Sequence, residues 1–267
     1  MKSQTKRTPK PNIAFLHIPK TSGQSIHQWI SNNYTNEQIC TARTNEQLFQ
    51  LPPVELRKYN FFSGHLDWNI LKSIKIFDYV FTVLRQPDER IVSFYFYLKK
   101  EAQRRKLKSE DKTLSPVLEM ALLPINQYFE NDDRNKRLFI DNHYNNFYSY
   151  YFASGSYNGF QRYGENKRLS DAKILSLAVE MILSDYDQIF SMQTINELPK
   201  VLASKFDFKG DKLRYINKNE AYSPSERGKD IADLALKVKW NWNSKIEELT
   251  RIDNILCDHL FNSRASD

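Results

Sequence analysis

The sequence predicts an α/β fold: a single domain in which helices flank a central, mostly parallel sheet. Two observations support this prediction. Short apolar segments rich in β-branched and aromatic residues alternate with longer segments whose apolar residues recur at helical spacing. The 267 residues suffice for one large domain with a substantial core, and neither an internal repeat nor a long linker divides them.

Four strands are expected, of which the first and third are the clearest. Residues 13–18 form an apolar run that breaks at Pro19-Lys20. Residues 78–84, DYVFTVL, combine β-branched and aromatic side chains and run directly into Arg85. Weaker strands are predicted over 60–63 and 186–190.

Helices are expected between and after these strands. Pro87 suits the first turn of a helix that begins near Asp88. Ser170 is a good N-cap for the helix that follows it. The expected helices span 22–32, a stretch from about 88, 170–183, 198–206 and 224–262.

Two segments are open to two interpretations each. Residues 144–160 are rich in Tyr and Phe, which usually pack a core but also stack on sugars or adenine. The basic residues between Arg104 and Lys108 are typical of a solvated surface, and they also suit contact with an anionic acceptor such as an acidic polysaccharide.

Composition excludes several classes of protein. A net charge of +7, with 40% hydrophobic and 27% charged residues, is ordinary for a globular protein and allows attraction to polyanions. Cys40 and Cys257 lie far apart without a CxxC pattern, so we expect reduced thiols and no metal site. Basic residues do not gather on one helix face, so a nucleic acid partner is not expected.

The N-terminal sequence bears on location. Residues 1–11 are polar and basic and are expected to form a disordered tail before a domain over 12–262. The first apolar segment is too short for a secretion signal or a membrane span. We therefore expect a cytoplasmic protein.

The segment after the first strand predicts an anion site. Pro19-Lys20-Thr21-Ser22-Gly23 lies between a predicted strand and a predicted helix. Backbone N–H groups at a helix N-terminus attract anions, and Lys20 adds a full positive charge. The lysine precedes the glycine, whereas a Walker A loop has its glycines first, so an ordinary ATPase or GTPase is disfavoured.

A second phosphate element follows the third strand. Arg85 stands at the strand end, and Ser93 follows eight residues later, about two helical turns along. An arginine fork and a serine hydroxyl can together hold one phosphate group.

Together these elements resemble a known family. PKTSGQS is similar to the 5′-phosphosulfate loop of sulfotransferases that use 3′-phosphoadenosine 5′-phosphosulfate (PAPS), and RQPDERIVSFYFY resembles their 3′-phosphate element. The Gly64-His65 pair after FFS is similar to a Gly-His pair that one branch of the carbohydrate sulfotransferases, the heparan/dermatan 2-O-sulfotransferases, carries shortly before its 3′-phosphate element. Looser similarity extends over most of residues 12–260, including 146–155 and 186–202.

The resemblance implies a sulfotransferase fold of the P-loop NTPase type and sulfuryl transfer from PAPS to a hydroxyl, in particular on a carbohydrate. It implies Lys20 and His65 as catalytic residues: Lys20 at the leaving phosphate and His65 as the base. No metal is required, and the product would be 3′,5′-ADP. The implied cofactor-binding residues are Lys20, Thr21, Ser22, Gly23, Gln24, Ser25, Arg85 and Ser93.

The chain departs from the family pattern at four positions. Ser22 and Gln24 replace residues that are often Gly or Ala and Thr, and Gln86 replaces the usual Asp. Tyr150 stands where relatives often have an arginine. That arginine's cofactor contact would then be missing or supplied elsewhere, the candidates being Arg162, Arg168 and Arg214.

Other histidines and other functions remain as alternatives. His17 is expected next to the site or in the core, His27 on a helix surface, and His143 in the core or at the acceptor. A nucleotide-dependent kinase and a non-catalytic polyanion-binding module are the competing functions. Binding of a 3′-phosphorylated nucleotide would exclude the kinase, and turnover would exclude the binding module.

Overall fold

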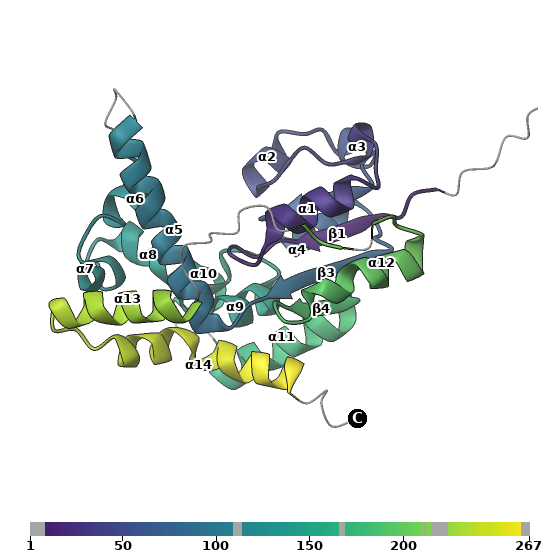
Figure 1. Cartoon of the computed structure of the whole chain (residues 1–267). Coiled ribbons are helices and arrows are strands. Elements are labelled where there is room, and N and C mark those ends of the chain that lie inside the picture. Colours follow the sequence, from purple (N-terminus) through teal and green to yellow (C-terminus); the bar gives the residue numbers. More distant parts are fainter. Residues whose placement is uncertain (1–8, 109–113, 166–168, 211, 215–223, 263–267) are drawn as a thin grey trace, which may run out of the picture. The chain divides into compact units, whose positions relative to one another are not determined.

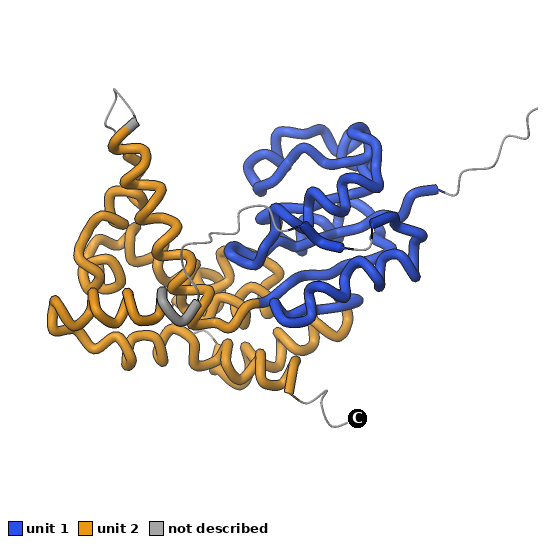
Figure 2. Tube along the Cα trace, viewed as in Figure 1, with its two compact units in different colours: residues 1–84, 185–216 blue, residues 85–184, 217–267 orange. Residues whose placement is uncertain are grey.

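The computed structural model describes residues 9–108, 114–165, 169–210, 212–214 and 224–262. The chain divides into two compact units (Figure 2). Unit 1 comprises Met1–Leu84 and Asp185–Ile216, and unit 2 comprises Arg85–Ser184 and Asn217–Asp267. Most of the expected basic tail, residues 1–8, lies outside the described residues.

Unit 1 contains a parallel sheet (Figure 1). Its four strands are β1 (Ile13–Leu16), β2 (Phe61–Gly64), β3 (Tyr79–Leu84) and β4 (Gln188–Ser191), in the order β2-β1-β3-β4. Every pairing is parallel, with Ile13 opposite both Phe61 and Tyr79. The prediction of an α/β fold with a mostly parallel sheet is therefore confirmed.

The core of unit 1 joins the sheet to two of its helices. Ile13 and Phe15 of β1 share one face because side chains alternate along a strand. They pack with aromatic residues of the neighbouring strands and with apolar residues of α1 (Gly23–Ser31) and α12 (Leu198–Phe206). Phe15 stacks on Phe81 at a ring distance of 4.9 Å. The remaining elements are η1 (Asn36–Gln38), α2 (Asn45–Phe49), α3 (Pro53–Leu56), α4 (Trp68–Ile74) and η2 (Ile195–Glu197).

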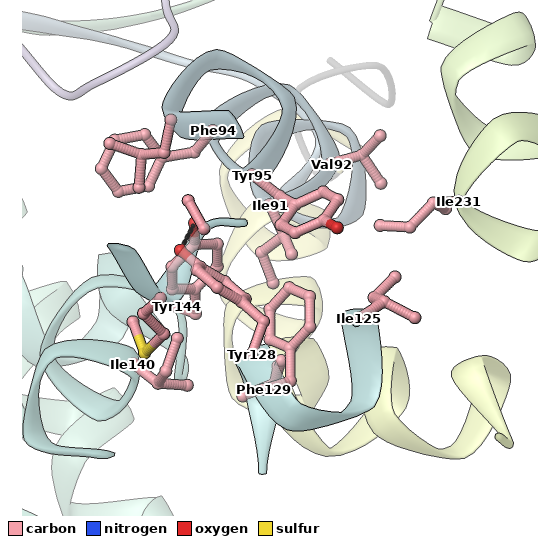
Figure 3. Packing of buried hydrophobic residues seen from close by; sticks show 14 of the residues in the cluster. Ile91, Val92, Phe94, Tyr95, Ile125, Tyr128, Phe129, Ile140, Tyr144 and Ile231 are labelled. Carbon is pink, nitrogen blue, oxygen red and sulfur yellow. Dashed lines mark hydrogen bonds between the residues drawn. The ribbon is translucent and has the colours of Figure 1, made fainter. Parts of the chain in front are cut away.

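The regular secondary structure in the described part of unit 2 is entirely helical. Its core is strongly aromatic and is drawn in Figure 3. Tyr128 and Tyr144 lie buried there and share a hydrogen bond of 2.7 Å between their hydroxyls. Its helices are α5 (Pro87–Lys108), α6 (Pro116–Met120), α7 (Ile125–Phe129), α8 (Arg134–His143), α9 (Phe147–Ser154), α10 (Gly159–Tyr163), α11 (Asp171–Asp185, whose last residue is counted in unit 1), α13 (Pro224–Lys237) and α14 (Trp242–Phe261).

The Tyr/Phe-rich segment packs the core of unit 2. All eight residues of α9 are buried. The buried carboxylate of Asp253 on α14 accepts hydrogen bonds from the backbone N–H groups of Tyr148 and Ser149 and from the Ser149 hydroxyl. These bonds tie the start of α9 to α14, which favours the core interpretation of this segment over ligand stacking.

The C-terminal helical pattern is broken once. The sequence suggests one helix over 224–262, whereas α13 ends at Lys237 and α14 begins at Trp242. Lys239 adopts a left-handed backbone conformation with φ 53°. Such a residue cannot continue a right-handed helix, so the chain turns there although its apolar spacing stays helical.

Candidate active site

The loop that follows β1 has a strained backbone. Lys20 (φ 75°) and Ser22 (φ 61°) both adopt left-handed conformations. Residues other than glycine rarely do so, at a cost of order 1–3 kcal/mol each, and such strain gathers at functional sites. The left-handed Ser22 turns the chain into α1, and its carbonyl accepts hydrogen bonds from the N–H groups of Ser25 and Ile26.

Side chains of the loop hold its shape. Thr21 is fully buried, and its hydroxyl donates to the carbonyl of Ile18 at 2.8 Å. The Ser22 hydroxyl donates to the Met192 sulfur at 3.8 Å and so connects this loop to the segment after β4. Any ligand contact by Thr21 would therefore come from its backbone N–H, because its side chain faces inward.

Gly23 is required by a close approach. An added Cβ at this position would lie closer than 3.0 Å to three atoms of the His17 ring, a separation that real Cβ atoms do not show. The ring therefore lies directly against the first residue of α1. The glycine of the predicted anion loop is thus explained by packing on His17 rather than by a positive φ angle.

His17 and His65 meet at the carboxyl edge of the sheet. His17 directly follows β1 and His65 directly follows β2, and these strands are paired in parallel. The His17 N–H donates to the Gly64 carbonyl at 3.0 Å. The two imidazole rings stack with centroids 4.6 Å apart and planes inclined by 28°. This pairing brings together two residues that lie 48 positions apart.

A hydrogen bond at Nδ1 indicates the tautomer of His65. Its Nδ1 lies 2.9 Å from the carbonyl oxygen of His17. A carbonyl oxygen only accepts, so the proton of the neutral ring lies on Nδ1 and the basic lone pair on Nε2. Burial lowers the pKa of His65 and the nearby Arg43 lowers it further, while the bond to His17 acts in the opposite direction. The net result is a ring that stays neutral at neutral pH.

Positive charge surrounds the histidine pair. Burial lowers the pKa of His17 well below its usual value, and His65, Arg43, Lys20 and His27 add to that effect. The ammonium of Lys20 is therefore close enough to His17 to act on it electrostatically. Lys20 and Arg43 thus place positive charge beside the two neutral histidines of unit 1.

Arg85 and Ser93 lie in unit 2. Arg85 directly follows the last residue of β3, and its Nε donates to the Glu89 carboxylate at 2.8 Å. Its two terminal nitrogens are the part of the guanidinium that would meet a phosphate. The Tyr148 hydroxyl donates to the Arg85 carbonyl at 2.8 Å and holds this backbone in place. Ser93 is buried on α5.

The structure places the other sequence candidates as follows. Gln24 is exposed at the start of α1, whereas Ser25 is buried. His143 donates from Nδ1 to the carbonyl of Phe139, 3.0 Å away, and stacks on the Phe139 ring, which favours a structural role. Tyr150 is buried against Phe160. Arg162 lies over the Tyr163 ring and Arg214 is exposed, whereas Arg168 is outside the described residues.

Two residues of the site were not predicted from the sequence. His27 was expected on a helix surface, but it is half-buried, stacks on Phe61 and accepts a hydrogen bond from Arg43. Arg43 was not singled out at all. Its position depends on isolated parallel bridges that pair residues 39–44 with β2 and the residue after it. No local sequence motif predicts this pairing.

The described part of the chain shows neither a metal-binding cluster nor a helix that could span a membrane. It holds no group of three or more His, Cys, Asp or Glu side chains placed to bind a metal ion. In the same part, none of the helices is both long and apolar enough to cross a membrane. Cys40 and Cys257 are both buried free thiols.

Comparison with known families identifies the chain. The model of the sulfotransferase family matches residues 3–197, more than half of the chain. The protein belongs to the sulfotransferase family. It is therefore a transferase of sulfuryl groups, and the fold described above is consistent with that family. A search of curated proteins gave no match.

Proposed function

We propose that this sulfotransferase moves the sulfuryl group of PAPS to a hydroxyl group of a carbohydrate acceptor. The observation that carries the proposal is the His17–His65 pair beside the Lys20 loop. It combines a base held in one tautomer with a lysine-bearing, strained loop at a helix N-terminus. Family membership supports transfer of a sulfuryl group. A sugar hydroxyl suits this polar site, in which His17, Lys20 and His65 are half-buried.

The chain offers suitable groups for both phosphates of the cofactor. Lys20, the backbone N–H groups from Thr21 to Gln24 and the Ser25 hydroxyl would hold the 5′-phosphosulfate, because backbone N–H groups at a helix N-terminus attract anions. The left-handed residues Lys20 and Ser22 shape this turn. Arg85 and Ser93 would hold the 3′-phosphate, which ATP lacks.

PAPS, when bound, supplies the sulfuryl group and a phosphate that leaves with added negative charge. His65 would take the proton of the acceptor hydroxyl at Nε2, since Nδ1 is engaged by the His17 carbonyl. The lowered pKa of His65 favours the neutral ring at neutral pH, the form that can take up a proton. The positive charge of Arg43 disfavours a proton on His65 before the acceptor arrives.

Lys20 would stabilise the charge that grows on the leaving phosphate. An ammonium group held in a partly dry loop stabilises the transition state more than the same group in water would, because it does not have to reorganise during the reaction. The strained backbone and the buried Thr21 fix the position of the Lys20 backbone, from which the side chain extends. Catalysis would then consist mainly of positioning and electrostatic stabilisation.

The first test measures thermal unfolding of the wild type and of Arg85→Ala with 3′,5′-ADP or with ATP. Ligand at about 100 times its dissociation constant stabilises a protein by roughly 2.7 kcal/mol, which raises the midpoint by about 5–10 °C for a chain of this size. We expect a shift with 3′,5′-ADP that Arg85→Ala loses. Arg137→Ala, which removes an exposed arginine of α8, is the matched control and should keep the shift.

Other outcomes would favour the competing functions. A larger shift with ATP than with 3′,5′-ADP would replace the proposal by a nucleotide-dependent kinase. A 3′,5′-ADP shift without any transfer from PAPS to a panel of glycosides, together with an indifferent Lys20→Ala variant, would indicate a polyanion-binding module.

A further inference from the structure

One hydroxyl on α9 holds both main-chain polar groups of Arg85. The Tyr148 hydroxyl donates to the Arg85 carbonyl at 2.8 Å and accepts from the Arg85 N–H at 3.2 Å. Arg85 lies in the junction between Leu84, the last residue of β3, and Pro87, the first residue of α5. A side chain from a helix far along the sequence therefore fixes the backbone from which the arginine side chain extends.

The surroundings of Tyr148 keep its hydroxyl protonated and its ring in place. Tyr148 is fully buried, and burial raises the pKa of its hydroxyl well above the usual value, against the opposing effect of Arg90. The Arg90 guanidinium lies over the Tyr148 ring, 5.3 Å from its centroid, and donates to the His143 carbonyl at 2.9 Å. The hydroxyl therefore has a proton to donate at neutral pH, and its ring is held on one face by a fixed cation.

The carboxylate of Asp253 anchors the first turn of α9 to α14. It accepts from the N–H of Tyr148 at 3.0 Å, and from the N–H and the hydroxyl of Ser149, both at 2.8 Å. Burial raises the pKa of Asp253 to about 6, while these bonds and the charge of Arg90 act in the opposite direction. At neutral pH the group is thus an ionised carboxylate that accepts from three donors, and the backbone of Tyr148 is one of them.

A second anchor, Asn146, precedes the same turn. It is buried and adopts a left-handed backbone conformation with φ 45°. Its side-chain nitrogen donates to the Glu248 carbonyl at 3.2 Å, and its side-chain oxygen accepts from the Ile252 N–H at 2.6 Å. Glu248 and Ile252 are four positions apart on α14, where a regular helix would pair these two groups with each other. A strained residue and buried polar side chains cost free energy, so the start of α9 is held more firmly than core packing alone requires.

The guanidinium of Arg85 is fixed at its other end by Glu89. Its Nε donates to the Glu89 carboxylate at 2.8 Å, which leaves the two terminal nitrogens for a ligand. The backbone is held by Tyr148 and the side chain by Glu89, and all three residues belong to unit 2. A group that is ordered in advance loses less conformational freedom when its ligand binds, which increases affinity.

We propose that Tyr148 is a positioning residue: its hydroxyl, anchored through Asp253, directs the guanidinium of Arg85 towards the 3′-phosphate of the cofactor. This inference rests on the proposed function, in which Arg85 holds that phosphate. Tyr148 and Asp253 act through the backbone of Arg85 and not by contact with the ligand. Their effect is therefore confined to the part of the nucleotide that Arg85 binds.

The test compares two nucleotides that differ only in the 3′-phosphate. Isothermal titration calorimetry on the full chain gives the affinities for 3′,5′-ADP and for 5′-AMP, and their ratio is the 3′-phosphate preference. Arg85→Ala should abolish this preference. Tyr148→Phe should weaken 3′,5′-ADP about 3- to 10-fold, the effect of one hydrogen bond, and should leave 5′-AMP unchanged. A purely structural role of Tyr148 would weaken both nucleotides equally.

Matched variants separate positioning from a general loss of packing. Tyr128→Phe removes another buried hydroxyl of unit 2, bonded at 2.7 Å to Tyr144 (Figure 3), and should leave the 3′-phosphate preference unchanged. Asp253→Asn should lower the preference in the wild type and have no further effect in Tyr148→Phe, because it acts through that hydroxyl. Ser149→Ala removes one of the three donors to Asp253 and is the milder variant, with a smaller loss in the same direction.

Amide hydrogen exchange without ligand tests the contact itself. In Tyr148→Phe the Arg85 amide should exchange faster, while the amides of Thr82 and Val83 in β3 keep their wild-type rates. Unchanged exchange at Arg85, or a 3′-phosphate preference that Tyr148→Phe keeps and Arg85→Ala loses, would overturn this inference and leave the proposed cofactor intact. A wild type that binds 3′,5′-ADP no better than 5′-AMP would overturn the cofactor assignment, and with it the role of Tyr148 towards the 3′-phosphate.

Discussion

Replacing Gly23 with alanine would place a methyl group where the His17 ring already lies. The new Cβ would come closer than 3.0 Å to three ring atoms. The ring has little freedom to withdraw, because it stacks between Phe15, at a centroid distance of 5.6 Å, and His65, at 4.6 Å. Either His17 leaves its stack on His65 or the start of α1 moves away from the sheet.

The size of the effect follows from two opposing contributions. Overpacking a closely packed site typically costs about 1–3 kcal/mol. Alanine is a better helix former than glycine by up to about 1 kcal/mol, and by less in a first turn. We therefore expect Gly23→Ala to lower the free energy of unfolding by about 1–2 kcal/mol, against a gain of about 0.5–1 kcal/mol for Gly228→Ala, where nothing lies within 4 Å of the new Cβ.

A double-mutant cycle with His17→Ala isolates the cause. Without the imidazole ring, Gly23→Ala should be neutral or slightly stabilising, which corresponds to a coupling free energy of about 2 kcal/mol. Urea denaturation gives the free energies, and hydrogen exchange at the β1 amides reports on unit 1 by itself. If Gly23→Ala costs the same with and without His17, the close approach of ring and helix is not what requires glycine.

Further predictions concern the reaction and its pH dependence. Lys20→Ala should reduce sulfuryl transfer at least about 100-fold, while Lys58→Ala, an exposed control in unit 1, should not; full activity of Lys20→Ala would remove that residue from the mechanism. His65→Gln should slow turnover by about 10²–10⁴-fold and leave the 3′,5′-ADP thermal shift intact; unchanged turnover would exclude His65 as the base. Because burial lowers the pKa of His65 and the neutral ring is the active form, the wild-type rate should rise with pH and level off, with a midpoint below 6.5; a midpoint above that value would contradict the assignment. Burial and Arg43 lower the pKa of His27 from 6.5 to about 4, so its contribution to stability is complete above pH 6.5 and is lost as the pH falls towards 4. The full shift would correspond to about 3.4 kcal/mol, which the exposed part of the ring reduces to about 1–2 kcal/mol. His27→Asn, which can still accept from Arg43, should flatten this dependence in urea titrations at pH 4–7, and an unchanged slope would show that His27 does not cause it.

Much of the fold could be predicted because its signals are local. The four strands lie within two or three residues of their predicted positions, since apolar β-branched and aromatic runs mark them directly in the sequence. The order of strand, lysine loop and helix around Lys20 could be predicted for the same reason. Arg85 at the end of β3 and the helix that starts at Pro87 follow from the chain itself.

The partners of these residues could not be predicted in this way. His17 stacks on His65 and His27 meets Arg43 only because β1, β2 and residues 39–44 pair in parallel with one particular register. A shift of that register by one residue would move every side chain to the other face, and no local pattern specifies which residues then meet. Gly23 likewise appears in the sequence as part of an anion loop, whereas its packing against His17 is evident only in the folded chain.

The sequence by itself thus determined the family, the fold class and the order of the four strands along the chain, because each depends on residues that are neighbours along the chain. The tertiary structure alone decided which histidine tautomer His65 adopts and where the charge of Arg43 lies. Both depend on hydrogen bonds and burial between segments that lie far apart in the sequence, and these form only when the sheet is assembled.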